Sequence, residues 1–393
     1  MKPTELQQEI RKMRFEEIYE SWQSRHLTQE EAARILGISD RTFRRYLQRY
    51  EEDGLEGLID KRLDQISHLK APVDEVLRLT TLYEKSYRGW NVKHFYSFYR
   101  RQHQGKRSYT WVKEALQEAE LVKRAKKRGA HRKKRERAVM PGMMLHQDGS
   151  SHEWVVGQKW DLIVTMDDAT SEHYSMFFVK EEGTASSFQG LQETIEKKGL
   201  PCSLYTDRGS HYWFTPKAGG KVDKLNLTQF GRGMQQLGIE MIPAYSPEAR
   251  GRSERAFRTH QDRLPKELAA LGIYTMAEAN HYLKKVYMKN FNKEFAVKAT
   301  NEVSAFVPWL GDSLQEILCE HHERVVGKDN CVAFKGLTLQ IPKDEYRCHY
   351  SKVKVRIHDY GNGTMAIFHG PRKVAQYDQQ GNLFVRKTLK KAA

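Results

Sequence analysis

Residues 1–62 carry apolar side chains at helical spacing, with polar positions between them. Within LTQEEAARILGISDRTFRRYLQRYEEDG, Thr28 and Glu31 form a T-x-x-E capping box that opens a short helix. Gly37 permits a sharp turn, and Ser39 is suited to cap the next helix. Two helices joined by such a turn are typical of a helix-turn-helix motif.

The second of these helices is predicted over residues 40–51 and is strongly basic. Its candidate DNA contacts are Arg41, Thr42, Arg44, Arg45 and Arg49. The alternative is an ordinary helical hairpin with a solvated basic face. The capping box, the turn and the density of arginine together favour a recognition helix for the DNA major groove.

Residues 71–121 look like a second, weaker copy of this arrangement. Two helices are split near Gly89, and Ser108 then caps a third predicted helix, YTWVKEALQEAEL. The turn before that helix, GKRS, is looser than the GIS turn of the first copy. We expect a second helix-turn-helix-like module, with candidate DNA contacts at Tyr109, Thr110 and Lys113.

From about residue 140 the pattern changes to short runs rich in Val, Ile, Phe and Tyr, which predict strands. The order β-β-β-α-β-α-β-α is typical of an α/β domain with a mixed sheet. Its first three strands should form an antiparallel meander, and the later strands should run parallel to the first. Residues 273–325 return to helical periodicity, and residues 330–388 suggest a small five-stranded barrel.

These patterns predict a multidomain chain that is all-α at the N-terminus, α/β in the centre and all-β at the C-terminus. The expected segments are a helix-turn-helix domain over 1–65, a second such module over 70–121, a basic linker over 122–139, an α/β core over 140–272, a helical extension over 273–327 and a small β-barrel over 328–393.

The composition narrows the class of partner. The 393 residues include 66 Lys and Arg against 50 Asp and Glu, a net charge of +16 that favours nucleic acid. The sequence contains no run of about 18 apolar residues, so it predicts no membrane span. The N-terminus lacks the apolar stretch of a signal peptide. The four cysteines form no CxxC pair, so we expect no disulfide framework. We therefore expect the protein to be located in a reducing cytosol.

The most basic stretch is VKRAKKRGAHRKKRER, over residues 122–137. A solvated linker is one interpretation. Because the block follows two predicted DNA-binding modules, we prefer a linker that tracks phosphates and adds salt-dependent affinity. Its candidate DNA contacts are Lys126, Lys127, Arg128, Arg132 and Lys133.

Three short motifs each contain a candidate catalytic carboxylate. HQDGS places Asp148 in the first core strand, TDRGS places Asp207 at the end of the fourth, and SPEARGRSER places Glu254 in the long helix after the fifth. A single acid among 50 is uninformative, but the order and placement of these three favour one shared site. Such a group can hold two hard cations, which activate a nucleophile and stabilise the leaving oxygen at phosphorus.

With these motifs, residues of about 140–310 resemble the DDE core of the retroviral-integrase-like transposase superfamily, which has a ribonuclease-H-like fold. The stretch FTPKAGGKVDKLNLTQFGRGMQQLGIEMIPAYSPEARGRSERAFRTHQDRLPKEL is similar to bacterial insertion-sequence transposases of the ISNCY group. Asp148, Asp207 and Glu254 match the three acids of the superfamily. The chain departs from its common pattern in having Asp-Arg-Gly at the second acid, Arg-Gly before the glutamate and a longer interval between the two.

The resemblance implies a DNA transposase that binds insertion-sequence ends and catalyses strand cleavage and strand transfer. It implies two Mg²⁺ ions held by the three acids, with Mn²⁺ as a substitute. The implied partners are double-stranded DNA, as terminal inverted repeats and as target, and further copies of the chain in a dimer or larger synaptic complex. The implied location is the bacterial cytoplasm, at the nucleoid. Basic and polar residues near the acids become candidate DNA contacts: Arg208, Arg250, Arg252, Arg258 and Gln261.

Asp148 competes with Asp161, Asp167 and Asp168 for the role of first ligand. In the ribonuclease-H-like order the first strand lies next to the fourth, which brings Asp148 within reach of Asp207. Asp167 and Asp168 end the antiparallel second strand, so they should emerge at the opposite end of the sheet, where DDATS is typical of a capped turn. Asp161 would have to turn across the sheet. We therefore predict Asp148.

Two other functions stay open. One is a DNA-binding regulator that occupies transposon-like ends without cutting them, and the other is a metal-dependent nuclease that hydrolyses DNA without joining it. A complete set of three acids favours the transposase, because a regulator has no reason to keep them.

Cys319, His321, His322 and Cys331 are candidate zinc ligands by residue type. Their spacing, C-x-H-H-x₈-C, is not a standard one. We prefer to interpret them as core and surface residues.

Overall fold

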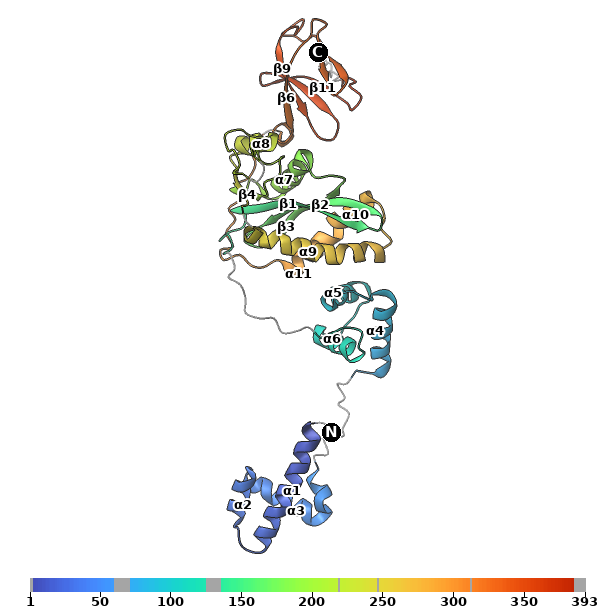
Figure 1. Ribbon diagram of the computed structural model, residues 1–393, viewed down its shortest axis with the longest axis vertical. Helices are drawn as coiled ribbons and strands as arrows, with labels where there is room; N and C mark the ends of the chain where they lie inside the picture. The colour runs from blue at the N-terminus through green and yellow to red at the C-terminus, as the bar shows by residue number, and fades with distance from the viewer. Residues whose placement is uncertain are drawn as a thin grey trace, which may run out of the picture. The chain divides into compact units, whose positions relative to one another are not determined.

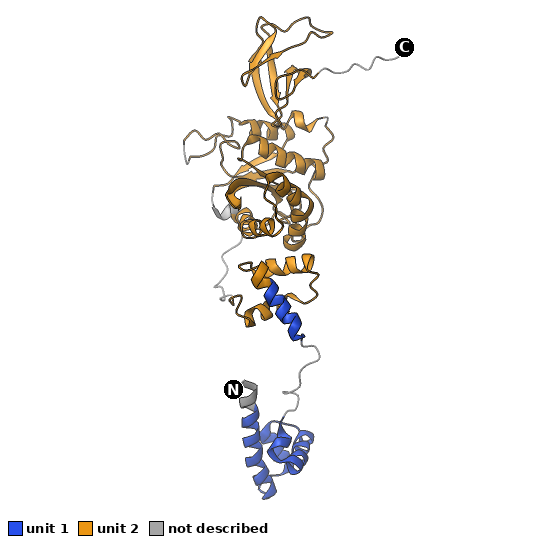
Figure 2. Ribbon diagram, turned by 90° about the vertical axis from the view of Figure 1, so that its right-hand side faces the viewer, with its two compact units in different colours: residues 1–82 blue, residues 83–393 orange. Residues whose placement is uncertain are grey.

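The computed structural model describes residues 3–59, 71–124, 136–217, 220–245, 247–311 and 313–384, with the backbone alone for 3–7 and 247–250. The chain divides into two compact units, Met1–Leu82 and Tyr83–Ala393 (Figure 2). Within the described ranges, no helix has both the length and the apolar character that crossing a membrane requires.

The first unit contains the expected helix-turn-helix. It comprises α1 (Pro3–Gln23), α2 (Gln29–Leu36), α3 (Asp40–Asp53) and the 3-10 turn η1 (Gly54–Leu58) (Figure 1). The predicted capping box forms at α2, where the Thr28 amide donates to the Glu31 carboxylate at 2.8 Å and the Glu31 amide donates to the Thr28 hydroxyl at 3.3 Å. Gly37 takes a left-handed φ of 66°, and Ser39 caps α3 by accepting from the Thr42 amide at 3.3 Å.

Three more helices follow: α4 (Val73–Ser86), α5 (Val92–Gln102) and α6 (Tyr109–Glu118). Ser108 caps α6 as predicted, because its hydroxyl accepts from the Trp111 amide at 3.3 Å. Asn91 caps α5 in the same way, accepting from the His94 amide at 2.8 Å.

The sheet at the centre of the second unit has the predicted order. Its strands are β1 (Met144–Val155), β2 (Gln158–Asp167), β3 (His173–Val179), β4 (Ser203–Thr206) and β5 (Glu240–Pro243). They lie in the order β3-β2-β1-β4-β5, with β1, β2 and β3 antiparallel and β4 and β5 parallel to β1. This confirms the meander and the parallel crossovers, and it places β4 beside β1.

Helices cover both faces of this sheet (Figure 1). α7 (Thr184–Lys198) and α8 (Gln229–Leu237) share one apolar core with Leu145 and Leu204. α9 (Pro247–Ala270), α10 (Met276–Tyr282), the π-helical turn η2 (Leu283–Tyr287) and α11 (Met288–Phe295) share the other with β2 and β3. The sheet is therefore buried on both sides, as in other layered α/β domains.

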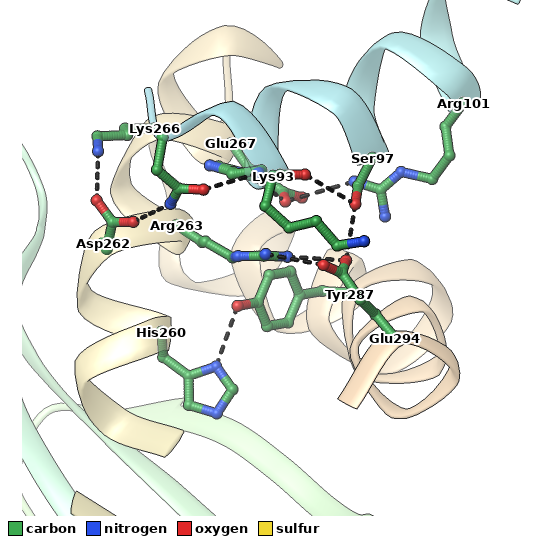
Figure 3. A network of polar contacts seen from close by, with 12 residues as sticks. Lys93, Ser97, Arg101, His260, Asp262, Arg263, Lys266, Glu267, Tyr287 and Glu294 are labelled. Atoms are coloured by element: carbon green, nitrogen blue, oxygen red, sulfur yellow. Dashed lines mark hydrogen bonds and ion pairs between the residues drawn. The ribbon is translucent and has the colours of Figure 1, made fainter. Parts of the chain in front are cut away.

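α5 packs against α9 and α11 through buried polar contacts (Figure 3). The Glu267 carboxylate of α9 lies 2.8 Å from His94 Nε2 and accepts from the Tyr282 hydroxyl and, at 3.4 Å, from Arg101. Ser97 donates to Glu294 of α11 at 2.8 Å. Glu267 is 1% exposed, so its charge depends on these partners.

The C-terminal strands do not form the expected closed five-stranded barrel. After a 3-10 turn, η3 (Leu314–Glu316), come β6 (Glu320–Val325), β7 (Cys331–Phe334), β8 (Leu337–Gln340), β9 (Lys354–Asp359), β10 (Met365–His369) and β11 (Arg372–Tyr377). In the described residues they make an open antiparallel sheet, β11-β10-β9-β6, and a separate hairpin, β7-β8, over one shared core. The two four-residue strands of the hairpin pair with each other and so do not join β6 to β11.

Removal of the Glu267 carboxylate should destabilise the second unit. Glu267→Ala leaves His94 and Tyr282 buried without their acceptor, which costs about 3–5 kcal/mol when a buried charged partner is lost. The midpoint of thermal unfolding should fall by several degrees. The control is Glu196→Ala, since Glu196 is an exposed residue of α7. Equal midpoints for the two variants would show that the contact is dispensable.

Candidate functional site

The pairing of β1 with β4 sets two of the predicted acids opposite each other. The parallel register matches Met144 with Ser203, Leu145 with Leu204 and His146 with Tyr205. Continued by two residues, it sets Asp148 opposite Asp207, the residue that directly follows β4. Adjacent strands are about 4.8 Å apart, so the two carboxylates are within reach of a shared cation.

Asp148 lies on the face of the sheet that α9 covers. Its neighbour Gln147 points to the other face, where it donates to the Ser187 carbonyl of α7 at 3.0 Å. Side chains alternate along a strand, so Asp148 shares the α9 face with His146 and Ser150. The Ser150 hydroxyl confirms this assignment, because it accepts from Gln261 of α9 at 3.0 Å.

Two contacts fix α9 along β1 and so locate Glu254. At one end Arg252 pairs with the buried Asp168, which also lies 2.6 Å from His146 Nε2. At the other end Gln261 reaches Ser150. Glu254 lies between Arg252 and Gln261 along α9. The helix therefore positions Glu254 above the part of β1 that contains Asp148. Its side chain is exposed, whereas Asp148 is buried.

The three acids are not drawn tightly together. In the described part of the chain, the sets of three potential ligands whose atoms all lie within 4.8 Å of one another belong to the C-terminal sheet and the residues beside it. Asp148 and Asp207 both act on the phenol of Tyr212: burial raises the pKa of Tyr212 well above its usual value, and Glu182, Asp148 and Asp207 raise it further. Of the three acids, Glu254 is the exposed one.

The competing acids are engaged elsewhere. Asp167 accepts from the amides of Gly142 and Thr170, both at 2.8 Å. Asp168 accepts from the Ala138 amide at 2.7 Å, and Asp161 accepts from the Glu182 amide at 2.7 Å. These contacts match the backbone-capping role expected of the Asp-Asp turn. They support Asp148 as the first ligand, which stays a prediction.

Two residues beside the acids had no role in the sequence analysis. The Glu182 carboxylate lies against Gly149, where any Cβ would overlap it, and His211 Nε2 lies 3.6 Å from the same carboxylate. The only sequence signal was the glycine directly after Asp148, because its missing side chain makes room for Glu182. Contacts over such sequence distances cannot be read from local periodicity.

The chemistry of the donors suits a hard divalent cation. Carboxylate oxygens are the ligands that Mg²⁺ prefers, and Asp148, Asp207 and Glu254 offer them from two adjacent strands and the helix that covers them. The β1–β4 register, continued by two residues, would bring Asp148 opposite Asp207, and the Glu254 side chain is exposed. The residues present therefore fit the expected magnesium site.

The predicted DNA contacts fall into three groups. Exposed side chains with room for DNA are Arg41, Arg44, Arg45, Arg49, Thr110, Arg208 and Arg258, while Thr42, Tyr109, Lys113 and Gln261 are half-buried. Arg252 has a structural task, since it pairs with the buried Asp168. Lys126, Lys127, Arg128, Arg132 and Lys133, and the side chain of Arg250, lie outside the described residues.

The chain is similar to a helix-turn-helix family and to two transposases. Residues 17–62 match the family described as "Helix-turn-helix domain". The putative transposase y4bF of Sinorhizobium fredii is 30% identical over 262 residues, which cover 65% of this chain and 56% of that protein. The transposase for insertion sequence IS1202 of Streptococcus pneumoniae is 30% identical over 202 residues, 51% of this chain and 43% of that protein. The chain thus spans about half the length of these curated relatives.

Solved structures give a looser likeness. The HTLV-2 integrase catalytic core domain in complex with magnesium, in its trimeric form, is 17% identical, with 37% of this chain and 87% of that chain covered and a TM-score of 0.30. The simian T-cell lymphotropic virus intasome in complex with PP2A regulatory subunit B56 gamma is 13% identical, with 71% and 91% covered and a TM-score of 0.34.

Magnesium should stabilise the folded chain through Asp148. A cation that binds only the folded state raises the unfolding midpoint with concentration. We expect Mg²⁺ to raise the midpoint of the wild type and of Glu196→Gln, an exposed residue of α7, but not that of Asp148→Asn. Differential scanning fluorimetry over a Mg²⁺ series measures this. An equal rise in Asp148→Asn would remove Asp148 from the site.

Proposed function

The chain is a relative of transposases, and on that premise we propose that it binds the ends of an insertion sequence and catalyses metal-dependent DNA strand cleavage and strand transfer. One observation supports the proposal: the β1–β4 register matches His146 with Tyr205, and if it continued by two residues it would bring Asp148 opposite Asp207. The helix-turn-helix match at residues 17–62 supplies the DNA-binding element.

In this proposal each acid has a separate task. Asp148, held rigidly in β1, and Asp207, at the free end of β4, supply oxygen ligands from adjacent strands. Glu254 closes the site from α9, and its exposed side chain gives it the freedom to do so when DNA arrives. Two Mg²⁺ ions, or Mn²⁺ in their place, would activate a water or a DNA 3′-hydroxyl and stabilise the leaving oxygen.

The rest of α9 would guide the reactive DNA end. Arg258 and Gln261 follow Glu254 by about one and two helical turns, so all three share one side of the helix. Arg258 is exposed and can meet a phosphate, while Gln261 is tied to Ser150 of β1 and holds the helix in register. A dimer or larger assembly would bring two DNA ends to one target, in the bacterial cytoplasm.

A joining assay tests the function directly. The purified full-length chain is incubated with candidate terminal repeats, a target plasmid and Mg²⁺. Joined products are expected. Hydrolysis of the ends without joining would identify a nuclease, and end binding without cleavage would identify a regulator.

Loss of one acid should separate chemistry from binding. Asp207→Asn and Glu254→Gln remove a metal ligand but leave the N-terminal helices intact, so joining should fall below detection while end binding is retained. Gel-shift and joining assays on the same preparations measure the two activities. Glu196→Gln on the exposed side of α7 is the matched control. Near-normal joining by either acid variant in Mg²⁺ would refute the assignment of the three acids.

The exposed arginines of α3 should set end specificity. Arg45→Ala should weaken binding to the terminal repeats by about 1–3 kcal/mol and reduce the preference over random duplex, because a base or phosphate contact is lost. Arg11→Ala removes the same charge from an exposed position of α1 in the same unit and is the control. Fluorescence anisotropy at several salt concentrations measures both. Equal losses in the two variants would mean that α3 contributes only general charge.

A further inference from the structure

Three potential metal ligands meet on one face of the C-terminal sheet, away from the acids. Cys319 directly precedes β6, His321 lies in β6, and His358 lies opposite His321 in β9. The Cys319 sulfur and one nitrogen from each imidazole all lie within 4.8 Å of one another. Cys319 and His321 are two residues apart, so they share a face of the strand.

One nitrogen of each imidazole is held by Glu316, and the Cys319 thiol donates to the Glu316 carbonyl oxygen at 3.4 Å. His358 Nδ1 lies 2.9 Å from the Glu316 carboxylate, and His321 Nε2 lies 3.0 Å from the Glu316 carbonyl oxygen. The Glu316 carboxylate also accepts from the Tyr360 hydroxyl at 2.6 Å and pairs with Lys373, and a carbonyl oxygen can only accept. Both nitrogens held by Glu316 therefore carry the ring proton and donate.

The two remaining nitrogens are acceptors without a donor. His358 Nε2 and His321 Nδ1 are buried and have no hydrogen-bond partner in the described part of the chain. His358 is only 4% exposed and Cys319 only 2%. A buried acceptor that lacks a partner is costly, and a metal ion would satisfy both lone pairs at once.

We propose that Cys319, His321 and His358 bind one zinc ion. Zinc takes thiolate and imidazole ligands, and its histidines typically donate their second nitrogen to a carboxylate or a carbonyl, as Glu316 accepts it here. Three protein ligands leave a fourth position for water, on the side where His321 is partly exposed. The set contains no carboxylate ligand, so Mg²⁺ does not compete for it.

This set differs from the one that the sequence suggested. His322 points to the opposite face of β6, where it lies 3.2 Å from Glu320, and the Cys331 sulfur lies 2.9 Å from Gln340. The cluster of Glu320, His322 and Asp359 on that face carries no proposal, because Lys335 already neutralises Asp359. The sequence pattern missed His358 because it is far from Cys319 along the chain.

Local charge and ring geometry set the conditions for binding. The guanidinium groups of Arg232 and Arg356 act electrostatically on His321. The guanidinium groups oppose a cation, and the thiolate that Cys319 becomes on binding offsets one unit of charge. The two rings stack with centroids 3.9 Å apart, and each keeps one nitrogen on Glu316.

A bound zinc ion would hold the edge of the C-terminal sheet. β6 is the terminal strand of the order β11-β10-β9-β6, and it pairs only with β9 among the described strands. Cys319 and His321 from β6 and its approach, with His358 from β9, would cross-link the two strands. The role is structural and independent of the acids.

The test uses full-length protein purified without a metal-affinity tag or chelator. Elemental analysis should find one zinc per chain that excess Mg²⁺ does not displace. After zinc is stripped and replaced by Co²⁺, the spectrum should show a thiolate-to-cobalt charge-transfer band. Cys319→Ser should lose that band, and His358→Gln should lose stoichiometric zinc, with circular dichroism used to confirm that each variant is folded.

Two controls separate this site from its surroundings. Cys331→Ser removes a thiol of the same domain that lies outside the set, and Asp148→Asn removes a predicted magnesium ligand; both should keep the zinc and the band. If Cys319→Ser unfolds, the wild-type cobalt spectrum alone decides. Absence of zinc and of the charge-transfer band in the wild type would overturn the proposal, as would an unchanged spectrum in folded Cys319→Ser. Because joining activity is not the readout, the result is independent of the proposed transposase function.

Discussion

The parallel pairing of β1 with β4 is the constraint on which the candidate site depends. It is set by only three matched pairs, from Met144 with Ser203 to His146 with Tyr205, and a slip of one residue would turn Asp148 and Asp207 away from each other. The register is protected by burial on both faces, since Leu145 and Leu204 belong to the core under α7 and α8. The site is therefore only as precise as the packing that prevents the slip.

α9 connects this constraint to the rest of the chain. Arg252 and Gln261 fasten it along β1, and Glu254 lies between them. Further along, Glu267 of the same helix anchors α5 through His94. One helix thus carries the predicted third acid and also contacts α5.

Local sequence rules predicted the features that local chemistry decides. The capping box at Thr28 and the cap at Ser108 follow from residue type and spacing, whereas the position of β4 beside β1 was expected from the family resemblance. The prediction of a closed barrel was wrong. β7 and β8 pair with each other and not with the four-stranded sheet, and residue type alone does not show which short strands will pair.

What sequence reasoning missed is carried by contacts between distant residues. Glu182, in the loop after β3, contacts Gly149 of β1. His358 of β9 lies opposite His321 of β6. Glu267 of α9 contacts His94 of α5, which lies 173 residues earlier in the chain. Periodicity and motif spacing describe one element at a time, so they assign a face to each side chain but not its partner.

Anomalous diffraction from crystals grown with Mn²⁺ tests the central claim most directly. The account predicts manganese between Asp148 and Asp207, with Glu254 turned in from α9 as a further ligand when the DNA end is bound. Manganese bound instead by Asp167 or Asp168, or density at Asp207 without Asp148, would contradict it.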